Sequence, residues 1–245
     1  MHHHHGECEV TGDASRVTQI LLFDIDGTLV LTGGAGGRAM TRAFEDVFAV
    51  PDAFRDVSMP GRTDTWILSD AAAAHGLSTE TERLAAFRDT YLGHLNRELQ
   101  EPGPRKGVMP GVVPLLDALE GRDDAYLALL TGNYEEAARA KLAYFDLWRY
   151  FRCGAFGDDA PDRNGLVPRA MAKIRECGGP VVPPHDVVVI GDTPLDVACA
   201  AASGARSVAV ATGGFDVQAL RVAGADIVLQ NFSDTREVLR ALQLA

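Results

Sequence analysis

The chain has 245 residues, of which 47% are hydrophobic and 23% are charged. This length and composition predict a globular protein with a sizeable core, built as one domain with an insertion or as two modest domains. The formal net charge is −11, and no Lys/Arg cluster offsets it. That balance disfavours nucleic acid as a partner without excluding an anionic substrate. No apolar run approaches the length of a membrane helix, so we expect no membrane partner.

The amino terminus begins with Met1 and four histidines, His2 to His5, a pattern typical of a purification tag. Residues 1–16 are therefore interpreted as a tag and a loose lead-in without an apolar signal segment, and these histidines enter no metal argument. The four cysteines, Cys8, Cys153, Cys177 and Cys199, have no metal-like spacing. They predict reduced thiols in a cytoplasmic protein.

The most informative stretch runs from Ile20 to Thr28 and leads from four apolar residues into two carboxylates, Asp24 and Asp26. The apolar run predicts a short buried strand, and Gly27 permits a sharp turn after it. Ligands bind at the carboxyl ends of strands in open α/β sheets. Two carboxylates this close repel unless one is protonated or a cation lies between them, and Mg²⁺ fits that role best. One carboxylate can then attack phosphorus while the other moves the proton; the alternative is a plain turn after a strand.

A helical segment follows this strand. Residues 32–37 are rich in glycine but too irregular for a phosphate-binding loop, so a flexible linker is favoured over a phosphate cradle. From residue 38 to residue 100 the apolar spacing is helical throughout, with a third helix expected from Thr79 and no strand. We therefore predict an all-helical inserted domain over residues 32–103.

The rest of the chain alternates between strands and helices. Expected strands cover residues 125–130, 152–156, 187–190, 207–211 and 226–229, with helices between and after them. This alternation predicts an α/β core domain, formed by residues 17–31 and 104–245, with a Rossmann-like, doubly wound parallel sheet.

Two of these strands also end in polar residues. Thr131 follows the first, and its hydroxyl, with the N–H groups around Gly132, can hold a phosphate oxygen; a turn or helix-cap role is the alternative. Asp192 follows a Val-rich strand, and Asp196 lies one helical turn beyond it. Both carboxylates can face one cation, although Asp192 could instead cap the helix that begins near Pro194.

These motifs together resemble the haloacid dehalogenase superfamily in its phosphatase form. Residues 23–29 resemble its first motif, residues 130–133 its second, and residues 191–196 its Gly-Asp-x-x-x-Asp motif. The resemblance implies that Asp24 is the nucleophile and a Mg²⁺ ligand, and that Asp26 is the acid/base whose backbone carbonyl binds the metal. It further implies that Asp192 is a metal ligand and that Asp196 supports the metal shell. The helical insertion after the first motif matches members with a helical cap, including phosphoglycolate phosphatase-like and β-phosphoglucomutase-like proteins.

The third motif departs from the family pattern, which places a Lys near the nucleophile. The corresponding stretch, residues 162–169, has no Lys at that position. Arg163 is the first candidate to replace it, because it precedes a helix and its guanidinium can bridge carboxylate and phosphate. Arg169 and Lys173 are the alternatives. In the predicted cap, Gly61 to Asp64 resembles the loop that faces the active site in these relatives, and there Arg62 either reads a substrate anion or is solvated.

The sequence thus predicts a Mg²⁺-dependent phosphatase acting on a small phosphorylated metabolite, phosphoglycolate-like or a sugar phosphate, through an aspartyl-phosphate. Its cap is expected to close as a lid over the substrate. The protein is expected to be a monomer or homodimer. A phosphomutase of the β-phosphoglucomutase type and a non-catalytic regulatory protein on the same scaffold are the alternatives. Asp26 argues against a dehalogenase, and the absence of Lys from residues 30–100 argues against a phosphonate hydrolase that uses a Schiff-base Lys.

Overall fold

A six-stranded sheet forms the centre of the molecule. The computed structural model describes residues 18–245, so the predicted tag and lead-in lie outside the described residues. The strands pair in parallel in the order β5-β4-β1-β6-β7-β8. Their bounds are β1 Gln19–Phe23, β4 Ala125–Leu130, β5 Gly154–Ala155, β6 Val187–Gly191, β7 Arg206–Val210 and β8 Ile227–Leu229. The predicted α/β fold with a Rossmann-like, doubly wound parallel sheet is confirmed.

The strand order reverses at β1, which lies between β4 and β6. Phe23, the last residue of β1, pairs with Leu129 on one side and with Ile190 on the other. The carboxyl ends of these three strands therefore meet at one point of the sheet edge. Such a reversal leaves a crevice between diverging connections, which is where open α/β sheets bind ligands.

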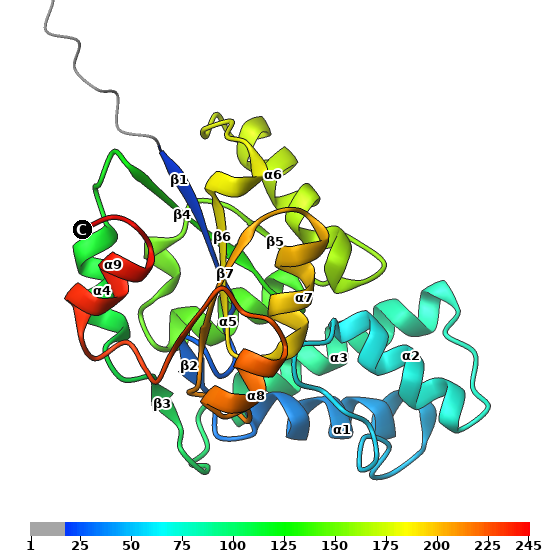
Figure 1. The fold of residues 1–245 in the computed structure, drawn as a ribbon. Coiled ribbons are helices and arrows are strands. Elements are labelled where there is room, and N and C mark those ends of the chain that lie inside the picture. The colour runs from blue at the N-terminus through cyan, green and yellow to red at the C-terminus, as the bar shows by residue number, and fades with distance from the viewer. Residues whose placement is uncertain (1–17) are drawn as a thin grey trace, which may run out of the picture.

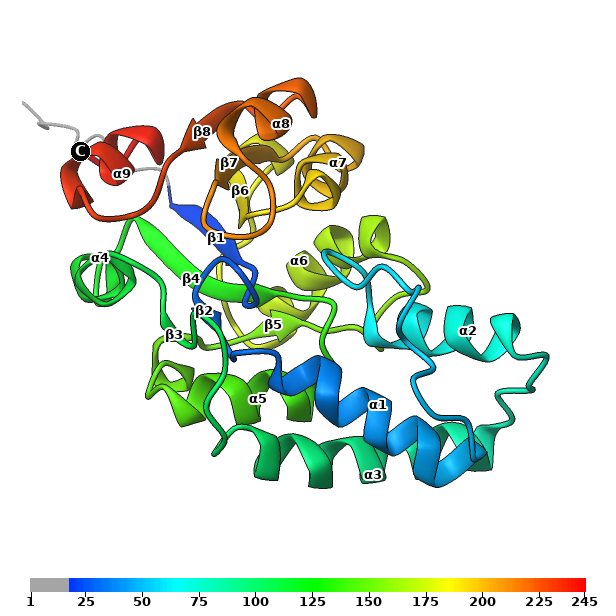
Figure 2. The same ribbon diagram turned by 90° about the horizontal axis from the view of Figure 1, so that it is seen from below.

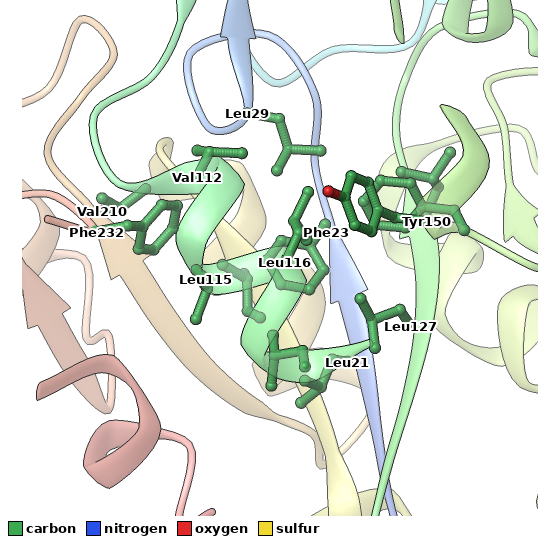
Figure 3. Packing of buried hydrophobic residues seen from close by; sticks show 14 of the residues in the cluster. Leu21, Phe23, Leu29, Val112, Leu115, Leu116, Leu127, Tyr150, Val210 and Phe232 are labelled. Carbon is green, nitrogen blue, oxygen red and sulfur yellow. The ribbon is translucent and has the colours of Figure 1, made fainter. Parts of the chain in front are cut away.

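Helices cover both faces of the sheet. Successive residues of a strand point to opposite sides, and the residues of β1 are all buried, so both faces need a covering layer. Leu21 and Phe23 face one core with α4 (Val112–Leu119) and α9 (Thr235–Ala241), as Figure 3 shows for α4. Ile20 and Leu22 face a second core with α6 (Leu166–Glu176) and α7 (Pro194–Ala202). Two more helices, α5 (Glu135–Tyr144) and α8 (Val217–Val222), complete the α/β part.

Three helices inserted after β1 pack on one another to one side of the sheet (Figures 1 and 2). They are α1 (Ala35–Phe48), α2 (Asp64–Ala74) and α3 (Thr81–Glu98). Their apolar faces form a separate core, which includes the buried rings of Phe44, Phe87 and Tyr91. As predicted, the structure has no strand between residues 38 and 100.

Local details of this region differ from the predictions. Helix α1 begins at Ala35, so half of the predicted glycine linker is helical, and Gly34 caps the helix with a φ of 82° that favours glycine. Helix α3 begins two residues later than expected, at Thr81. An antiparallel pair, β2 (Val30–Leu31) and β3 (Gly107–Val108), joins the two crossings between the helices and the sheet. Strands of two residues have no periodicity from which to predict them.

No helix in the described part of the chain is long and apolar enough to cross a membrane. Cys153, Cys177 and Cys199 form no disulfide in the described part of the chain, and Cys8 lies outside the described residues.

Candidate active site

Three buried carboxylates converge at the carboxyl ends of β1 and β6. One oxygen each from Asp24, Asp192 and Asp196 can be chosen so that all lie within 4.8 Å of one another. Their residues are at most 5% exposed. The structure thus brings together the acidic residues that the sequence placed on two separate strands.

The turn after β1 fixes Asp24 in this cluster. The Asp24 backbone N–H donates to the Ile190 carbonyl at 2.9 Å and so continues the parallel pairing with β6. Gly27 has a φ of +78°, and a Cβ there would lie 2.3 Å from Asp192 Oδ2. Thr28 Oγ1 then donates to Asp192 Oδ1 at 3.0 Å. Glycine at position 27 is therefore required both by its backbone conformation and by the close approach of Asp192.

The start of α7 fixes the other two carboxylates. Thr193 caps this helix and Pro194 occupies its first turn, so the alternative in which Asp192 is the cap is wrong. Asp196 completes a capping box, because its Oδ2 accepts from Thr193 N at 3.0 Å and its own N–H donates to Thr193 Oγ1 at 3.4 Å. Asp192 is left free of helix-capping contacts and faces Asp24.

Mutual repulsion and burial make this cluster a poor place for three negative charges. Burial raises the pKa of Asp24 to about 7, against the opposing effect of Arg163. Burial, followed by the charges of Asp196 and Asp24, raises the pKa of Asp192 well above its usual range. A hard divalent cation relieves such repulsion, and an all-oxygen donor set of this kind suits Mg²⁺. Asp24 and Asp192 therefore fit a magnesium site, with Asp196 beside it.

Arg163 is the cation that contacts the carboxylate cluster. It lies in a 3₁₀ turn, Arg163–Gly165, just before α6, and is 6% exposed. Its Nη2 lies 3.1 Å from Asp24 Oδ2 and also donates to Asp196 Oδ1, while Nη1 donates to the Gly61 carbonyl at 3.2 Å. Burial alone would lower the pKa of Arg163, but Asp196 and Asp24 raise it above its ordinary value.

The two alternatives to Arg163 point elsewhere. Arg169 Nη1 lies 3.7 Å from Glu176 Oε1, and Lys173 Nζ lies 2.9 Å from Asp159 Oδ2. Neither lines the cavity at the sheet edge.

Asp26 is held by two residues that the sequence did not single out. Lys141 Nζ, on α5, donates to both oxygens of Asp26 at 2.9 Å and to Asn133 Oδ1 at 2.7 Å. Asn133 Nδ2 donates to Asp26 Oδ2 at 2.8 Å. Lys141 is 5% exposed and lies on the apolar face of α5 with Ala137, Ala138 and Leu142. A single Lys on an otherwise apolar helix face was the signal for it in the sequence.

The second motif, residues 130–133, forms a tight turn that contacts the loop preceding α2. Thr131 Oγ1 accepts from Asn133 N at 3.2 Å and from Asn133 Nδ2 at 2.7 Å, so the hydroxyl does have the turn role. A Cβ on Gly132 would lie 2.1 Å from the Arg62 carbonyl oxygen. The Asp64 N–H donates to the Gly132 carbonyl at 2.8 Å, and Asp64 Oδ2 accepts from Tyr134 N at 2.8 Å. Asp64 therefore links the loop before α2 to the turn formed by the second motif.

Arg62 lines the cavity, but its guanidinium is engaged within the helical region. Its Cζ lies 5.5 Å from the centroid of the Trp66 ring, and its Nη1 lies 3.5 Å from Asp70 Oδ2. Asp64, two residues later, is the buried carboxyl of this loop, and sequence reasoning missed it.

A cavity of about 320 Å³ lies between the sheet edge and the helices. Its polar lining includes Asp24, Asp26, Asp192, Arg163 and Lys141, and Met40, Met59 and Ile67 supply apolar wall from the helical side. The site can therefore enclose a small molecule between carboxylates and two buried cations.

The site is acidic, lies at the switch point of a parallel α/β sheet and is bordered by the inserted helices. A family profile described as haloacid dehalogenase-like hydrolase matches residues 18–204. The chain belongs to this family, and it is an enzyme by that membership.

Two of its relatives are named as phosphoglycolate phosphatases. The chain is 31% identical to phosphoglycolate phosphatase from Rhodospirillum rubrum, covering 87% of each chain. It is 28% identical to phosphoglycolate phosphatase 1 from Pseudomonas aeruginosa, covering 90% of this chain and 79% of that one. Among solved structures, a hydrolase from Pseudomonas syringae superimposes with a TM-score of 0.67 at 23% identity, over 91% of this chain and 99% of that one.

Proposed function

We propose that this chain is a Mg²⁺-dependent phosphatase that hydrolyses a small phosphorylated metabolite through an aspartyl-phosphate on Asp24. The observation that carries the proposal is the convergence of Asp24 and Asp192 from two strands, with Arg163 Nη2 3.1 Å from Asp24 Oδ2. The names of the relatives support phosphoryl chemistry, with phosphoglycolate or a sugar phosphate as the substrate.

Asp24, the backbone carbonyl of Asp26 and Asp192 would hold the metal. When bound, Mg²⁺ supplies charge compensation for the carboxylates and for the phosphoryl oxygens. The fit rests on the buried carboxylate oxygens of Asp24, Asp192 and Asp196, which lie within 4.8 Å of one another and form the all-oxygen donor set that Mg²⁺ prefers.

Asp24 is the group placed to attack phosphorus, because it is the carboxylate that ends β1 and contacts Arg163. The Arg163 guanidinium holds this carboxylate and can extend to a transferring phosphoryl oxygen. Thr131 and the backbone of Gly132 line the same wall and can hold a second oxygen. These groups stabilise charge that spreads over the phosphoryl oxygens in the transition state.

Asp26, which also lines the cavity, is the acid/base. It donates a proton to the leaving oxygen and then takes one from the water that hydrolyses the aspartyl-phosphate. Lys141 and Asn133 orient its carboxyl group.

Helices α1 to α3, within residues 32–103, would act as the cap that closes over the substrate. Gly61 and Arg62 on the cap loop would then complete the site, and Arg62 would read a distal anionic group. We further propose that the enzyme works in the cytoplasm on a small-molecule substrate.

Release of inorganic phosphate from small phosphate monoesters tests the proposal directly. Wild type should release phosphate with Mg²⁺ and lose this activity with a chelator. Asp24→Asn should abolish release and also the phosphoryl adduct that mass spectrometry detects on acid-quenched wild type. Asp234→Asn, which alters the cap of α9, a helix with no residue in the cavity lining, is the matched control. Isomerisation of a sugar phosphate without phosphate release would instead identify a mutase, and activity of Asp24→Asn equal to wild type would refute the mechanism.

A further inference from the structure

The wall of the cavity next to Asp26 determines which leaving groups fit, if the proposed phosphatase function holds. Because Asp26 protonates the leaving oxygen, the carbon attached to that oxygen must lie on the same side. Three other cavity residues share this side with Asp26: Tyr91 from α3, Asp64 from α2 and Lys141 from α5.

The Tyr91 hydroxyl is a buried polar group without a partner. Tyr91 is fully buried, and its hydroxyl has no hydrogen bond in the described part of the chain. Its ring is fixed by stacking on Phe87, with centroids 6.1 Å apart. Burial, followed by the charges of Asp64 and Asp26, holds the pKa of Tyr91 well above its usual range, so the hydroxyl keeps its proton. Buried hydroxyls nearly always have a partner, and here a ligand can supply it.

Gly36 lies beside this hydroxyl on the cavity wall. Although Gly36 lies within α1, where glycine is unfavourable, it also lines the cavity. A Cβ at this position would lie 3.3 Å from Lys141 Nζ and 3.9 Å from Tyr91 Oη. The absence of a side chain therefore leaves room beside the ammonium group and the phenol.

The charges at this wall disfavour an anionic ligand group. Lys141 contacts Asp26 Oδ1, Asp26 Oδ2 and Asn133 Oδ1, so its positive charge is already paired with the Asp26 carboxylate. Asp64 directs Oδ2 to the Tyr134 N–H and leaves Oδ1 as an acceptor. A carboxylate placed here would face Asp26 and Asp64, beside an ammonium group whose charge is already paired with Asp26. A hydroxyl can accept from Tyr91 and donate to Asp64, so it satisfies both.

We propose that Tyr91 and Asp64 form a subsite for a substrate hydroxyl close to the ester oxygen. The preferred substrate is then a hydroxyl-bearing phosphate monoester, such as a polyol or sugar phosphate, rather than a carboxylate-bearing one such as phosphoglycolate. Tyr91 donates to the substrate hydroxyl, and Asp64 accepts from it.

Three phosphate esters of nearly equal size test this directly: 2-hydroxyethyl phosphate, 2-phosphoglycolate and ethyl phosphate. We expect wild type to hydrolyse 2-hydroxyethyl phosphate with a kcat/KM about 3- to 10-fold above that for ethyl phosphate, the effect of about one net hydrogen bond. It should also exceed that for 2-phosphoglycolate. Para-nitrophenyl phosphate is included as a general phosphatase substrate.

Two variants separate a recognition role from a structural one. Tyr91→Phe keeps the stacked ring but removes the donor, so the preference for 2-hydroxyethyl phosphate over ethyl phosphate should fall to near unity. Tyr126→Phe, on β4 and outside the cavity lining, should keep the wild-type ratio. Asp64→Asn removes a negative charge while keeping an oxygen for Tyr134 N, and it should raise the ratio of 2-phosphoglycolate to 2-hydroxyethyl phosphate about tenfold. A loss of packing alone would lower all rates without changing these ratios.

A wild-type preference for 2-phosphoglycolate, or an unchanged substrate ratio in Tyr91→Phe, would overturn the hydroxyl subsite. If para-nitrophenyl phosphate is still hydrolysed in that case, the proposed phosphatase function stands. If no ester is hydrolysed, the phosphatase function and the subsite both fail.

Discussion

Replacing Arg163 by Met is the most direct test of the electrostatics of the site. The side chain is 6% exposed and contacts Asp24 and Asp196, so its loss leaves two buried carboxylates without their cation. Breaking a buried ion pair typically costs about 3–5 kcal/mol of stability, and Mg²⁺ should recover part of it. Loss of one preorganised donor from the transition state lowers kcat about 10²- to 10³-fold. We therefore expect Arg163→Met to fold with a lower Tm and to turn over at least 100-fold more slowly.

Matched variants locate the effect. Arg163→Lys keeps the charge but cannot contact both carboxylates and the Gly61 carbonyl together, so we expect a loss of about tenfold. Arg169→Met and Lys173→Met remove the other two cations considered from the sequence, and each should stay within about twofold of wild type, as exposed or peripheral pairs contribute little. The assay is phosphate release from para-nitrophenyl phosphate with saturating Mg²⁺, with circular dichroism melts to confirm folding. The reasoning is refuted if Arg163→Met keeps more than half of the wild-type kcat, or if either other variant loses more activity.

Three further predictions concern the opposite side of the cavity. Burial raises the pKa of Asp64 from 3.8 to about 7. Ionisation of Asp64 therefore lowers the free energy of unfolding: the loss is absent below pH 4, grows between pH 4 and pH 7, and is complete above pH 7. Asp64→Asn should therefore raise the free energy of unfolding, measured in chelator, by up to about 4 kcal/mol at pH 8 and by little at pH 4, since one pKa unit corresponds to about 1.36 kcal/mol. Urea denaturation at the two pH values measures this, and an equal difference between variant and wild type at both would contradict the prediction. Lys141→Met leaves Asp26 without its main donor, and we expect kcat to fall about 10- to 100-fold with a smaller change in KM, measured by steady-state kinetics; a change in KM alone would exclude a positioning role. Gly132→Ala forces a Cβ to within 2.1 Å of a cap-loop carbonyl and should lower both Tm and kcat/KM, whereas Gly93→Ala, in open space on α3, should raise Tm slightly without affecting activity.

The fold and the metal-facing half of the site follow patterns that are local in sequence. An apolar run ending in Asp24, and another ending in Asp192, mark two buried strands and the charges at their carboxyl ends. Alternation of strands and helices then fixes a parallel sheet, and parallel strands bring such residues to one edge. Arg163 was one of three candidate cations, because proximity to a helix start does not specify which side chain turns inward. The contacts of Arg163 with Asp24 and Asp196 distinguish it from the other two.

The half of the site around Asp26 depends on packing between segments far apart in the chain. Lys141 lies 115 residues from Asp26, and its burial requires α5 to pack against both the sheet and the inserted helices. Asp64 follows the helix cap Thr63, so its type is equally well explained as an acidic residue in a first helical turn. Tyr91 matches the apolar spacing of α3, which conceals its hydroxyl. Lys141 gave a local signal, as a single Lys on an apolar helix face, whereas Asp64 and Tyr91 satisfy local structural rules that conceal their second roles.

The two buried cations of the cavity, Arg163 and Lys141, pair with different carboxylates. Arg163 neutralises the carboxylates beside the proposed metal position, and Lys141 neutralises Asp26 at the leaving-group end. Lys141 is paired with Asp26, whereas Arg163 lies between Asp24 and Asp196, where the metal and the phosphoryl group are proposed to bind. Under the proposed function, a phosphate monoester would bind with its dianionic group toward Arg163 and its leaving group toward Asp26 and Tyr91. This orientation places the ester oxygen next to Asp26, so the same arrangement of charges that selects the substrate also aligns it for proton transfer.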